Sequence, residues 1–294
     1  MKKIYVLIFL IFGSVGVWGQ TSYTSTAVGT AWNALRWNNA ADVAPYTSAF
    51  TATNNASFTS GTYTFGGQGS TVAVGNVTVA AGVSVTYTAA SSSFNTGASV
   101  RTFDIGSGGL FDFNGQAIST AAGTGFIKNG AGVFASAGAA FPGGFTLNAG
   151  TVIARGTTAF GSGGTNTLTV NGGTIAANGN RSFANTRFPS GIVIGGDFQL
   201  GEIPANVALA SNTANLQFDN NVSLGASTRT ITLGNASTNT FTGIISNTSG
   251  GLTIAANANG TTGSVIITGA NTYTGATTIT GGTLTTGAAN TIPL

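Results

Sequence analysis

The residues of this chain that could perform acid–base chemistry are carboxylates, because the sequence contains neither histidine nor cysteine. Histidine-based triads, imidazole catalysis, histidine-ligated zinc and thiol nucleophiles are therefore excluded. Six acidic residues remain: Asp42, Asp104, Asp112, Asp197, Glu202 and Asp219. Any hydrolytic or lyase activity would depend mainly on this small set.

Two pairs of these carboxylates flank turns and could lie close together. Asp104 and Asp112 stand on either side of one glycine-rich turn, and Asp197 and Glu202 flank another short segment. Glycosidases need two carboxyl groups about 5 to 9.5 Å apart, which either pair could supply. However, Asp beside Gly or Asn at a strand end is usually a turn residue that binds its own backbone. We therefore predict no catalytic residue, and keep a carbohydrate-active enzyme with paired carboxylates as the alternative.

Metal and ice binding find little support in the sequence. The calcium-binding nonapeptide Gly-Gly-x-Gly-x-Asp is missing, and one Asp with carbonyl groups holds calcium only weakly. We predict no metal site and no cofactor. The threonines between Thr272 and Thr286 could form a regular ice-binding surface. Because Thr also favours strands and gives solubility without charge, we favour that ordinary interpretation, which a thermal hysteresis measurement would test.

The composition indicates a β protein rather than a helical or disordered one. Charged residues make up 5% of the chain, against about 25% in typical domains, while 42% is hydrophobic. Thr, Val, Ile and Phe suit strands, and the 46 glycines fall mostly between apolar runs, where they indicate turns. Most basic residues are scattered singly, which argues against nucleic-acid binding: Arg36, Arg101, Lys128, Arg155, Arg181, Arg187 and Arg229.

The N-terminus has the features of a signal peptide. Lys2 and Lys3 precede the apolar run 4–17, and small residues follow, which predicts a signal peptide over residues 1–19 and cleavage before Gln20. The run is shorter than the roughly 20 residues of a membrane-spanning helix, so a retained anchor is the less favoured alternative. No later segment qualifies as a helical span, so we expect a secreted or bacterial cell-surface protein without a membrane span in the mature chain.

One short pattern recurs along the chain: two alternating apolar residues, a four-residue turn rich in Gly and Asn, then another apolar residue. Its copies are Phe103–Leu110, Phe145–Val152, Leu168–Ile175 and Thr277–Leu284. The first positions are 42, 23 and 109 residues apart, which correspond to two, one and five units of roughly 22 residues. A unit of this size cannot bury its own apolar face, so it must stack on its neighbours.

This repeat predicts an all-β fold, a right-handed parallel β-helix (β-solenoid), with Leu147, Val170 and Ile279 stacked in one interior ladder. About 12 coils at about 4.8 Å would make a rod on the order of 60 Å long. A β-sandwich, which also uses many short strands, is the alternative.

The two ends of the chain differ from the repeats. We expect residues 20–65 to form an N-terminal cap, with Trp32 and Trp37 packed over the first coil, or else holding a sugar ring. Residues 66–294 would form the β-helix repeats. Because residues 292–294 follow a repeat directly, we also expect the natural polypeptide to continue beyond this sequence.

The segment Ile267–Thr286 closely resembles the autotransporter-associated β-strand repeat, also called the passenger-associated transport repeat, whose pattern is G-x-N-T-Y-x-G-x-T-x-I-x-x-G-T-L. The closest repeat lies within residues 251–286, and residues 125–132 followed by 145–152 are similar to a more diverged copy; residues 172–175 could belong to a third. The resemblance implies a parallel β-helix passenger of a secreted bacterial protein, in which the repeat assists export or folding.

The expected function is that of a secreted or surface-displayed structural or adhesive passenger domain without catalysis. Its expected partners are the bacterial export machinery and host, matrix or polysaccharide surfaces.

Overall fold

The regular structure of this chain consists of β-strands. The computed structural model describes residues 22–25, 37–39, 54–65, 72–87, 94–95, 97, 99–114, 117–119, 124–140, 143–161, 164–207, 213–260, 262–287 and 292–293. Nothing in that part of the chain is a helix long and apolar enough to cross a membrane.

The strands form three sheets, named sheets A, B and C here. Sheet A contains, in spatial order, β2 (Trp37–Asn39), β1 (Ser22–Ser25), β3 (Asn55–Phe58), β6 (Val77–Val79), β9 (Arg101–Ile105), β12 (Phe126–Asn129), β14 (Phe145–Leu147), β16 (Leu168–Val170), β19 (Ile192–Ile194), β22 (Val222–Ser223) and β25 (Ile245–Ser246).

Sheet B contains β4 (Thr62–Phe65), β7 (Ser84–Tyr87), β10 (Leu110–Asp112), β13 (Val133–Ala140), β15 (Thr151–Thr158), β17 (Thr174–Ala177), β20 (Phe198–Leu200), β23 (Arg229–Leu233), β26 (Leu252–Ala256) and β28 (Thr277–Ile279). A branch that joins it at β13 contains β11 (Ala117–Ser119), β8 (Phe94–Asn95) and β5 (Val72–Ala73). Sheet C contains β18 (Arg181–Phe183), β21 (Leu216–Phe218), β24 (Thr238–Phe241), β27 (Ser264–Ile267) and β29 (Thr283–Thr286).

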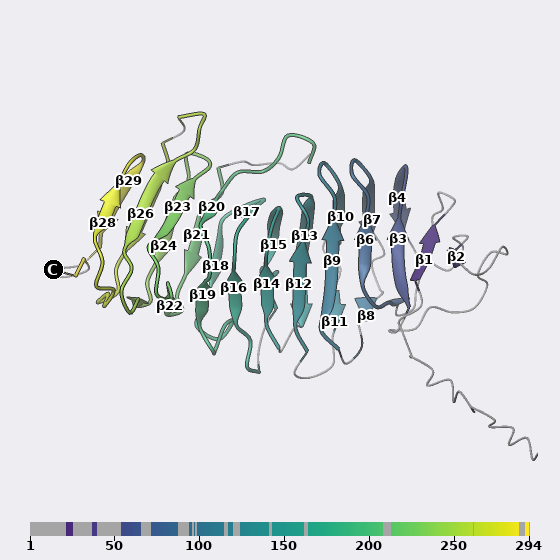
Figure 1. Cartoon of the computed structure of the whole chain (residues 1–294), viewed down its shortest axis with the longest axis horizontal. Helices are drawn as coiled ribbons and strands as arrows, with labels where there is room; N and C mark the ends of the chain where they lie inside the picture. The colour runs from purple at the N-terminus through teal and green to yellow at the C-terminus, as the bar shows by residue number, and fades with distance from the viewer. Residues whose placement is uncertain are drawn as a thin grey trace, which may run out of the picture.

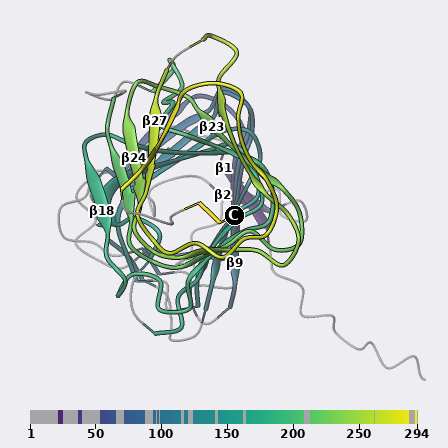
Figure 2. The same cartoon turned by 90° about the vertical axis from the view of Figure 1, so that its left-hand side faces the viewer.

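The chain visits the sheets in turn and advances by one strand at each visit, which makes a parallel β-solenoid of about eight turns. Figure 1 shows the coils stacked along the long axis, and Figure 2 shows them superimposed around one common outline. From β3 to β25 every pairing in sheet A is parallel. This confirms the all-β solenoid and rules out the β-sandwich, which requires antiparallel sheets.

Coil length varies more than the sequence repeat suggests. Phe126 pairs with Phe145, 19 residues later, whereas Ile192 pairs with Val222, 30 residues later. The described chain makes about eight turns, against the dozen expected for the whole mature chain. The interval of 23 residues between Phe145 and Leu168 is confirmed as one coil, because these two residues are direct partners.

The interior of the solenoid is a continuous apolar column. Phe126 and Phe145 stack with ring centroids 5.4 Å apart, and farther along Phe183, Phe218 and Phe241 stack at 5.3 and 5.2 Å. These side chains point inward from alternate strand positions, as strand geometry requires. Each coil therefore buries much of its apolar face against its neighbours, and the column holds the coils together.

The predicted ladder of Leu147, Val170 and Ile279 is correct for two of its three members. Leu147 and Val170 are partners in sheet A, and both are fully buried. Ile279 lies instead in sheet B, where it pairs with Ile254, and it is 52% exposed because β28 is the last described strand of that sheet. The repeat containing Ile279 occupies the corner between sheets B and C, whereas the repeats containing Leu147 and Val170 occupy the corner between sheets A and B.

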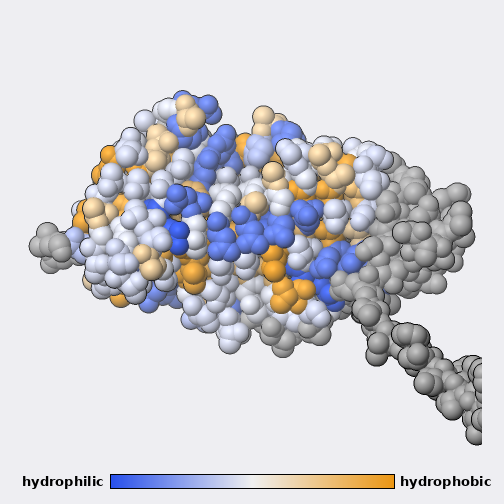
Figure 3. Space-filling model, in the orientation of Figure 1, coloured by the Kyte–Doolittle hydropathy of each residue, from blue (hydrophilic) through white to orange (hydrophobic). Residues whose placement is uncertain are grey.

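The corner between sheets A and B carries a ladder of asparagine side chains. The Asn148 amide donates to Asn129 Oδ1 at 2.8 Å, and the Asn171 amide donates to Asn148 Oδ1 at 2.8 Å. These residues are the turn asparagines of successive coils, so their hydrogen bonds join three coils outside the core. On the face shown in Figure 3, hydrophilic residues gather in a band along the long axis, between small separate apolar patches.

A segment after β20 folds back over the outer face of sheet B. Ile203 and Val207 pack there against a small apolar cluster that includes Val133, Ala135 and Ile153. The Asn206 amide donates to the carbonyl of Gly108, 98 residues earlier, at 2.9 Å. This segment lies within the 30-residue coil, so the extra length covers an apolar patch that would otherwise face water.

The predicted signal peptide and Trp32 lie outside the described residues. Within the range expected to form the cap, β1 and β2 pair antiparallel, and β1 continues sheet A in parallel with β3. In the same range, β3 and β4 pair with β6 and β7 of the solenoid.

Candidate functional site

Asp104 and Asp112 are carried by different sheets and have different surroundings. Asp104 is exposed on the outer face of β9, between the buried Phe103 and Ile105. Asp112 is 6% exposed in β10; it forms an ion pair with Arg155 and accepts a hydrogen bond from the Asn114 backbone N–H at 2.8 Å. The structure therefore gives Asp112 a structural ion pair and leaves Asp104 on a neighbouring face.

Asp197 and Glu202 lie at the two ends of β20 and bind different groups. Asp197 Oδ1 accepts from the Thr230 backbone N–H at 2.8 Å, which joins two coils, and Glu202 accepts from the Gln199 side chain. Neither residue binds the backbone of its own turn in these contacts: Asp197 binds the backbone of the next coil, and Glu202 binds a side chain of its own coil. Asp42 lies outside the described residues. Among the residues that the structure does describe, no three His, Cys, Asp or Glu side chains group together to hold a metal ion.

Lys128 is a buried cation inside the solenoid wall. It occupies an inward register position between Phe103 and Leu147, and its side chain is fully buried. Its ammonium group donates to the carbonyls of Asn129, of Gly130 at 2.7 Å and of Ala149 at 3.2 Å. Burial lowers the pKa of Lys128 to about 8, and the negative charge of Asp104 acts in the opposite direction. Lys128 thus ties together the turns of two successive coils.

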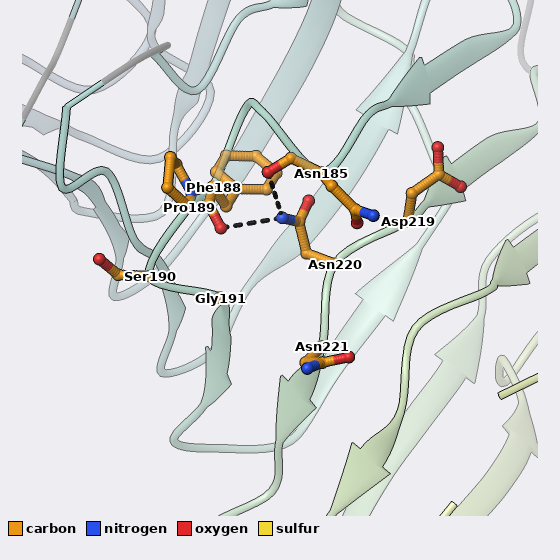
Figure 4. A pocket seen from close by; sticks show the side chains of 8 residues that line it. All are labelled: Asn185, Phe188, Pro189, Ser190, Gly191, Asp219, Asn220 and Asn221. Atoms are coloured by element: carbon orange, nitrogen blue, oxygen red, sulfur yellow. Dashed lines mark hydrogen bonds between the residues drawn. The ribbon is translucent and has the colours of Figure 1, made fainter. Parts of the chain in front are cut away.

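One pocket of the described surface lies where sheet C leads back to sheet A. It has a volume of about 360 Å³ and opens between the turn after β18 and the corner after β21. The Asn220 amide donates to the carbonyls of Asn185 and Phe188, both at 2.8 Å, which fixes its orientation (Figure 4). Asn220 is 5% exposed, and its buried Oδ1 has no hydrogen-bond partner within the described structure. Because this oxygen is enclosed by protein, Asn220 forms the wall of the pocket, and its neighbours supply the accessible polar groups.

Two neighbours complete the polar lining of this pocket. Asp219 Oδ1 accepts from Gln217 Nε2 at 2.7 Å and from Thr242 Oγ1 at 2.8 Å, so its second oxygen stays available. Asn221 Oδ1 accepts from the Ile244 backbone N–H at 3.0 Å, which leaves the amide N–H groups of Asn221 available as donors. The pocket therefore presents acceptors and donors side by side.

A second hollow adjoins this pocket on the outer face of sheet C. It has a volume of about 350 Å³ and is lined by side chains from β18, β21 and β24, among them Ser182, Gln217 and Thr240. These three residues are register partners in adjacent strands. Gln217 lines this hollow and also donates to Asp219 of the first pocket, so the two hollows lie next to each other.

Sequence reasoning missed both Asn220 and the inward position of Lys128. The signal for Lys128 was the alternation within β12, where it shares the parity of the apolar Phe126. Asn220 offered no such signal, because Asp219-Asn220-Asn221 reads as an ordinary turn, and its partners at 185 and 188 lie more than thirty residues away. Only the stacking of coils brings them together.

When the chain is compared with models of protein families, with curated proteins and with solved structures, none of them matches.

Proposed function

We propose that this chain is an exported structural or adhesive passenger domain of the autotransporter-associated repeat type, which displays a rigid solenoid at or beyond the bacterial surface. The observation that carries the proposal is the continuous apolar column, in which about eight turns share one interior. A solenoid of this kind gives an elongated and regular surface, the property that a spacer or adhesive domain requires.

The placement of the carboxylates supports a role without catalysis. Asp112 is bound by Arg155, Glu202 by Gln199, and Asp197 by the Thr230 backbone, so each carries a structural contact. Asp104 faces solvent on a different sheet from Asp112. The alternative, a polysaccharide lyase or glycosidase, would need two carboxyl groups directed at one sugar linkage.

Export is tested by producing the full chain with its N-terminus in a Gram-negative host and fractionating the cells. We expect the mature N-terminus to begin at Gln20, as read by mass spectrometry of the exported protein. Full-length, unprocessed protein that stays in the cytoplasm would contradict the export part of the proposal. A variant with Lys2 and Lys3 changed to Glu serves as the control, because it removes the positive start on which signal recognition depends.

The absence of catalysis is tested with purified protein on neutral and acidic polysaccharides, by assaying new reducing ends and unsaturated products. We expect neither to accumulate above the buffer blank. Sustained product formation that is lost in Asp197→Asn or Asp104→Asn would establish the enzyme instead. Both variants keep the size of the side chain, so a loss of activity would report chemistry rather than folding.

A further inference from the structure

We propose that the polar groove formed by the pocket at Asn220 and the adjoining hollow on sheet C binds a neutral oligosaccharide, with one sugar ring in each part. The inference names a ligand for the adhesive role proposed above, although binding itself can be measured without reference to export. Asn220 holds the wall of the pocket in place through two backbone carbonyls, while the second oxygen of Asp219 and the amide of Asn221 have no partner within the described structure.

The hydrogen-bonding groups of the pocket match hydroxyl groups better than other ligand chemistry. A hydroxyl donates one hydrogen bond and accepts others. The second oxygen of Asp219 needs a donor, whereas the amide of Asn221 needs an acceptor. A sugar supplies both kinds of group from neighbouring carbons, either directly or through a water that it orders.

Other ligand classes fit less well. No Lys or Arg lines the first pocket, and Asp219 brings a negative charge, so a phosphate or a uronic acid would be repelled there. Arg181 in the adjoining hollow already donates hydrogen bonds to the Arg155 carbonyl at 2.6 Å and to Asn178 Oδ1 at 2.7 Å. A calcium ion usually takes six to eight oxygens and several charges, but this site offers one carboxylate and competing N–H groups.

The size and shape of the groove favour a chain of sugars over a single ring. Each part has a volume near the lower end of the range for small-molecule sites, which is about 300 to 1,000 Å³. Gln217 stands between them, since it lines the hollow and donates to Asp219 at 2.7 Å. Pro189 is exposed at the rim of the pocket, where its ring offers an apolar surface to the C–H face of a sugar.

The test is isothermal titration calorimetry of the full purified chain with neutral oligosaccharides of one to four units, and with uronic acid oligomers of the same lengths. We expect neutral oligomers to bind, with affinity rising from one unit to two or more, and uronic acid oligomers to bind more weakly. The first variant is Asn185→Ala, because it removes an exposed side chain and keeps the backbone carbonyl that holds Asn220. It should weaken binding about tenfold.

Two further variants test the hollow on sheet C and a control position outside the groove. Ser182→Tyr fills the hollow from an exposed position, so it should abolish the gain in affinity with length while sparing the binding of a single unit. Asn259→Ala removes an exposed asparagine that lines neither hollow and should bind as the unchanged protein does. The thermal unfolding midpoint of each variant is recorded to show that it is folded.

The inference is overturned if no neutral oligosaccharide binds, if uronic acids bind more tightly, or if Asn185→Ala binds like the unchanged protein. None of these results would affect the proposed display function, which depends on export. Conversely, a chain that is retained in the cytoplasm but binds sugars through Asn185 would leave the groove standing and contradict the display function.

Discussion

Lys128 of β12 is the register partner of Leu147 in β14, so a lysine fills an interior position that the next coil fills with leucine. Its methylene groups lie in the wall of the apolar column, while the ammonium group reaches the carbonyls of Gly130 and Ala149 at the corner. The residue therefore links two energetic features of the fold, the buried column and the hydrogen-bonded turns. Because its charge is desolvated there, stability should depend on its protonation.

Lys128 should make the chain more stable in alkaline solution. Its pKa is lowered to about 8 in the folded state, from 10.5 in the unfolded chain, so the folded state binds fewer protons between these values. Unfolding free energy should therefore rise with pH from about 8 and level off above about 10.5, by on the order of 3 kcal/mol at most. Urea unfolding at a series of pH values measures this slope.

Lys128→Met is the control for that prediction, because it keeps an unbranched side chain and cannot titrate. Its absolute stability combines a gain from removing a buried charge with a loss from leaving three carbonyls without a donor, so only the slope is diagnostic. If the alkaline rise persists unchanged in Lys128→Met, another group is responsible for it.

A close approach between coils should make Gly150 much less replaceable than Gly260. Both have φ just above +70°, a backbone conformation that costs alanine about 1 to 2 kcal/mol. A Cβ on Gly150 would also come within 2.3 Å of the Gly132 carbonyl oxygen, whereas a Cβ on Gly260 would meet nothing within 4 Å. Gly150→Ala should thus destabilise by at least about 3 kcal/mol, and Gly260→Ala by only about 1 to 2 kcal/mol.

Chemical denaturation of the two glycine variants gives the comparison directly. Since both substitutions carry the same cost in φ, the difference between them isolates the steric contact between successive coils. Equal losses of stability would mean that the coils can separate locally without cost, contrary to the tight stacking described here.

The Arg155–Asp112 ion pair should be worth more than any exposed carboxylate contact. The side chains are 15% and 8% exposed, and removing one partner leaves the other charge buried without compensation. Asp112→Ala should therefore cost about 3 kcal/mol, and the double variant with Arg155→Met should cost less than the sum of the two single changes. Asp197→Asn, on an exposed residue, should change stability by about 0.5 kcal/mol or less. Additive losses in the double variant would show that the two charges do not depend on each other.

The fold was predictable because its signals are local and repeated. Alternating apolar residues and glycine turns such as Phe145–Val152 specify a strand, a corner and another strand, and the 23-residue interval to Leu168 specifies the stacking. The prediction failed over longer distances, where the sequence does not show which corner of the solenoid a repeat occupies. The 30-residue coil from Ile192 to Val222 and the different corner of Thr277–Leu284 could not be read from a motif that fits either corner.

The candidate site could not be predicted from the repeat pattern, for a physical reason. Asn220 is notable only because its amide meets the carbonyls of Asn185 and Phe188 from the preceding coil. No property of the local sequence encodes that meeting, since it depends on the length of the 30-residue coil between them. The paired carboxylates were found from the sequence, but their partners, such as Arg155, come from other coils as well.

The last prediction concerns the two isoleucines that share one register position, Ile254 and Ile279. Ile254 is fully buried between coils, whereas Ile279 has a strand partner on one side only among the described strands and is 52% exposed. Ile254→Ala should therefore cost about 2 to 5 kcal/mol, from lost apolar burial and the cavity left behind. Ile279→Ala, the same chemical change one coil farther along, should cost about 1 kcal/mol or less, because much of its side chain is already in water. Urea unfolding of the two variants measures this difference in stability. If Ile279→Ala costs as much as Ile254→Ala, β28 is covered by another surface in solution. A second copy of the chain in that position would be detected as a larger particle by light scattering.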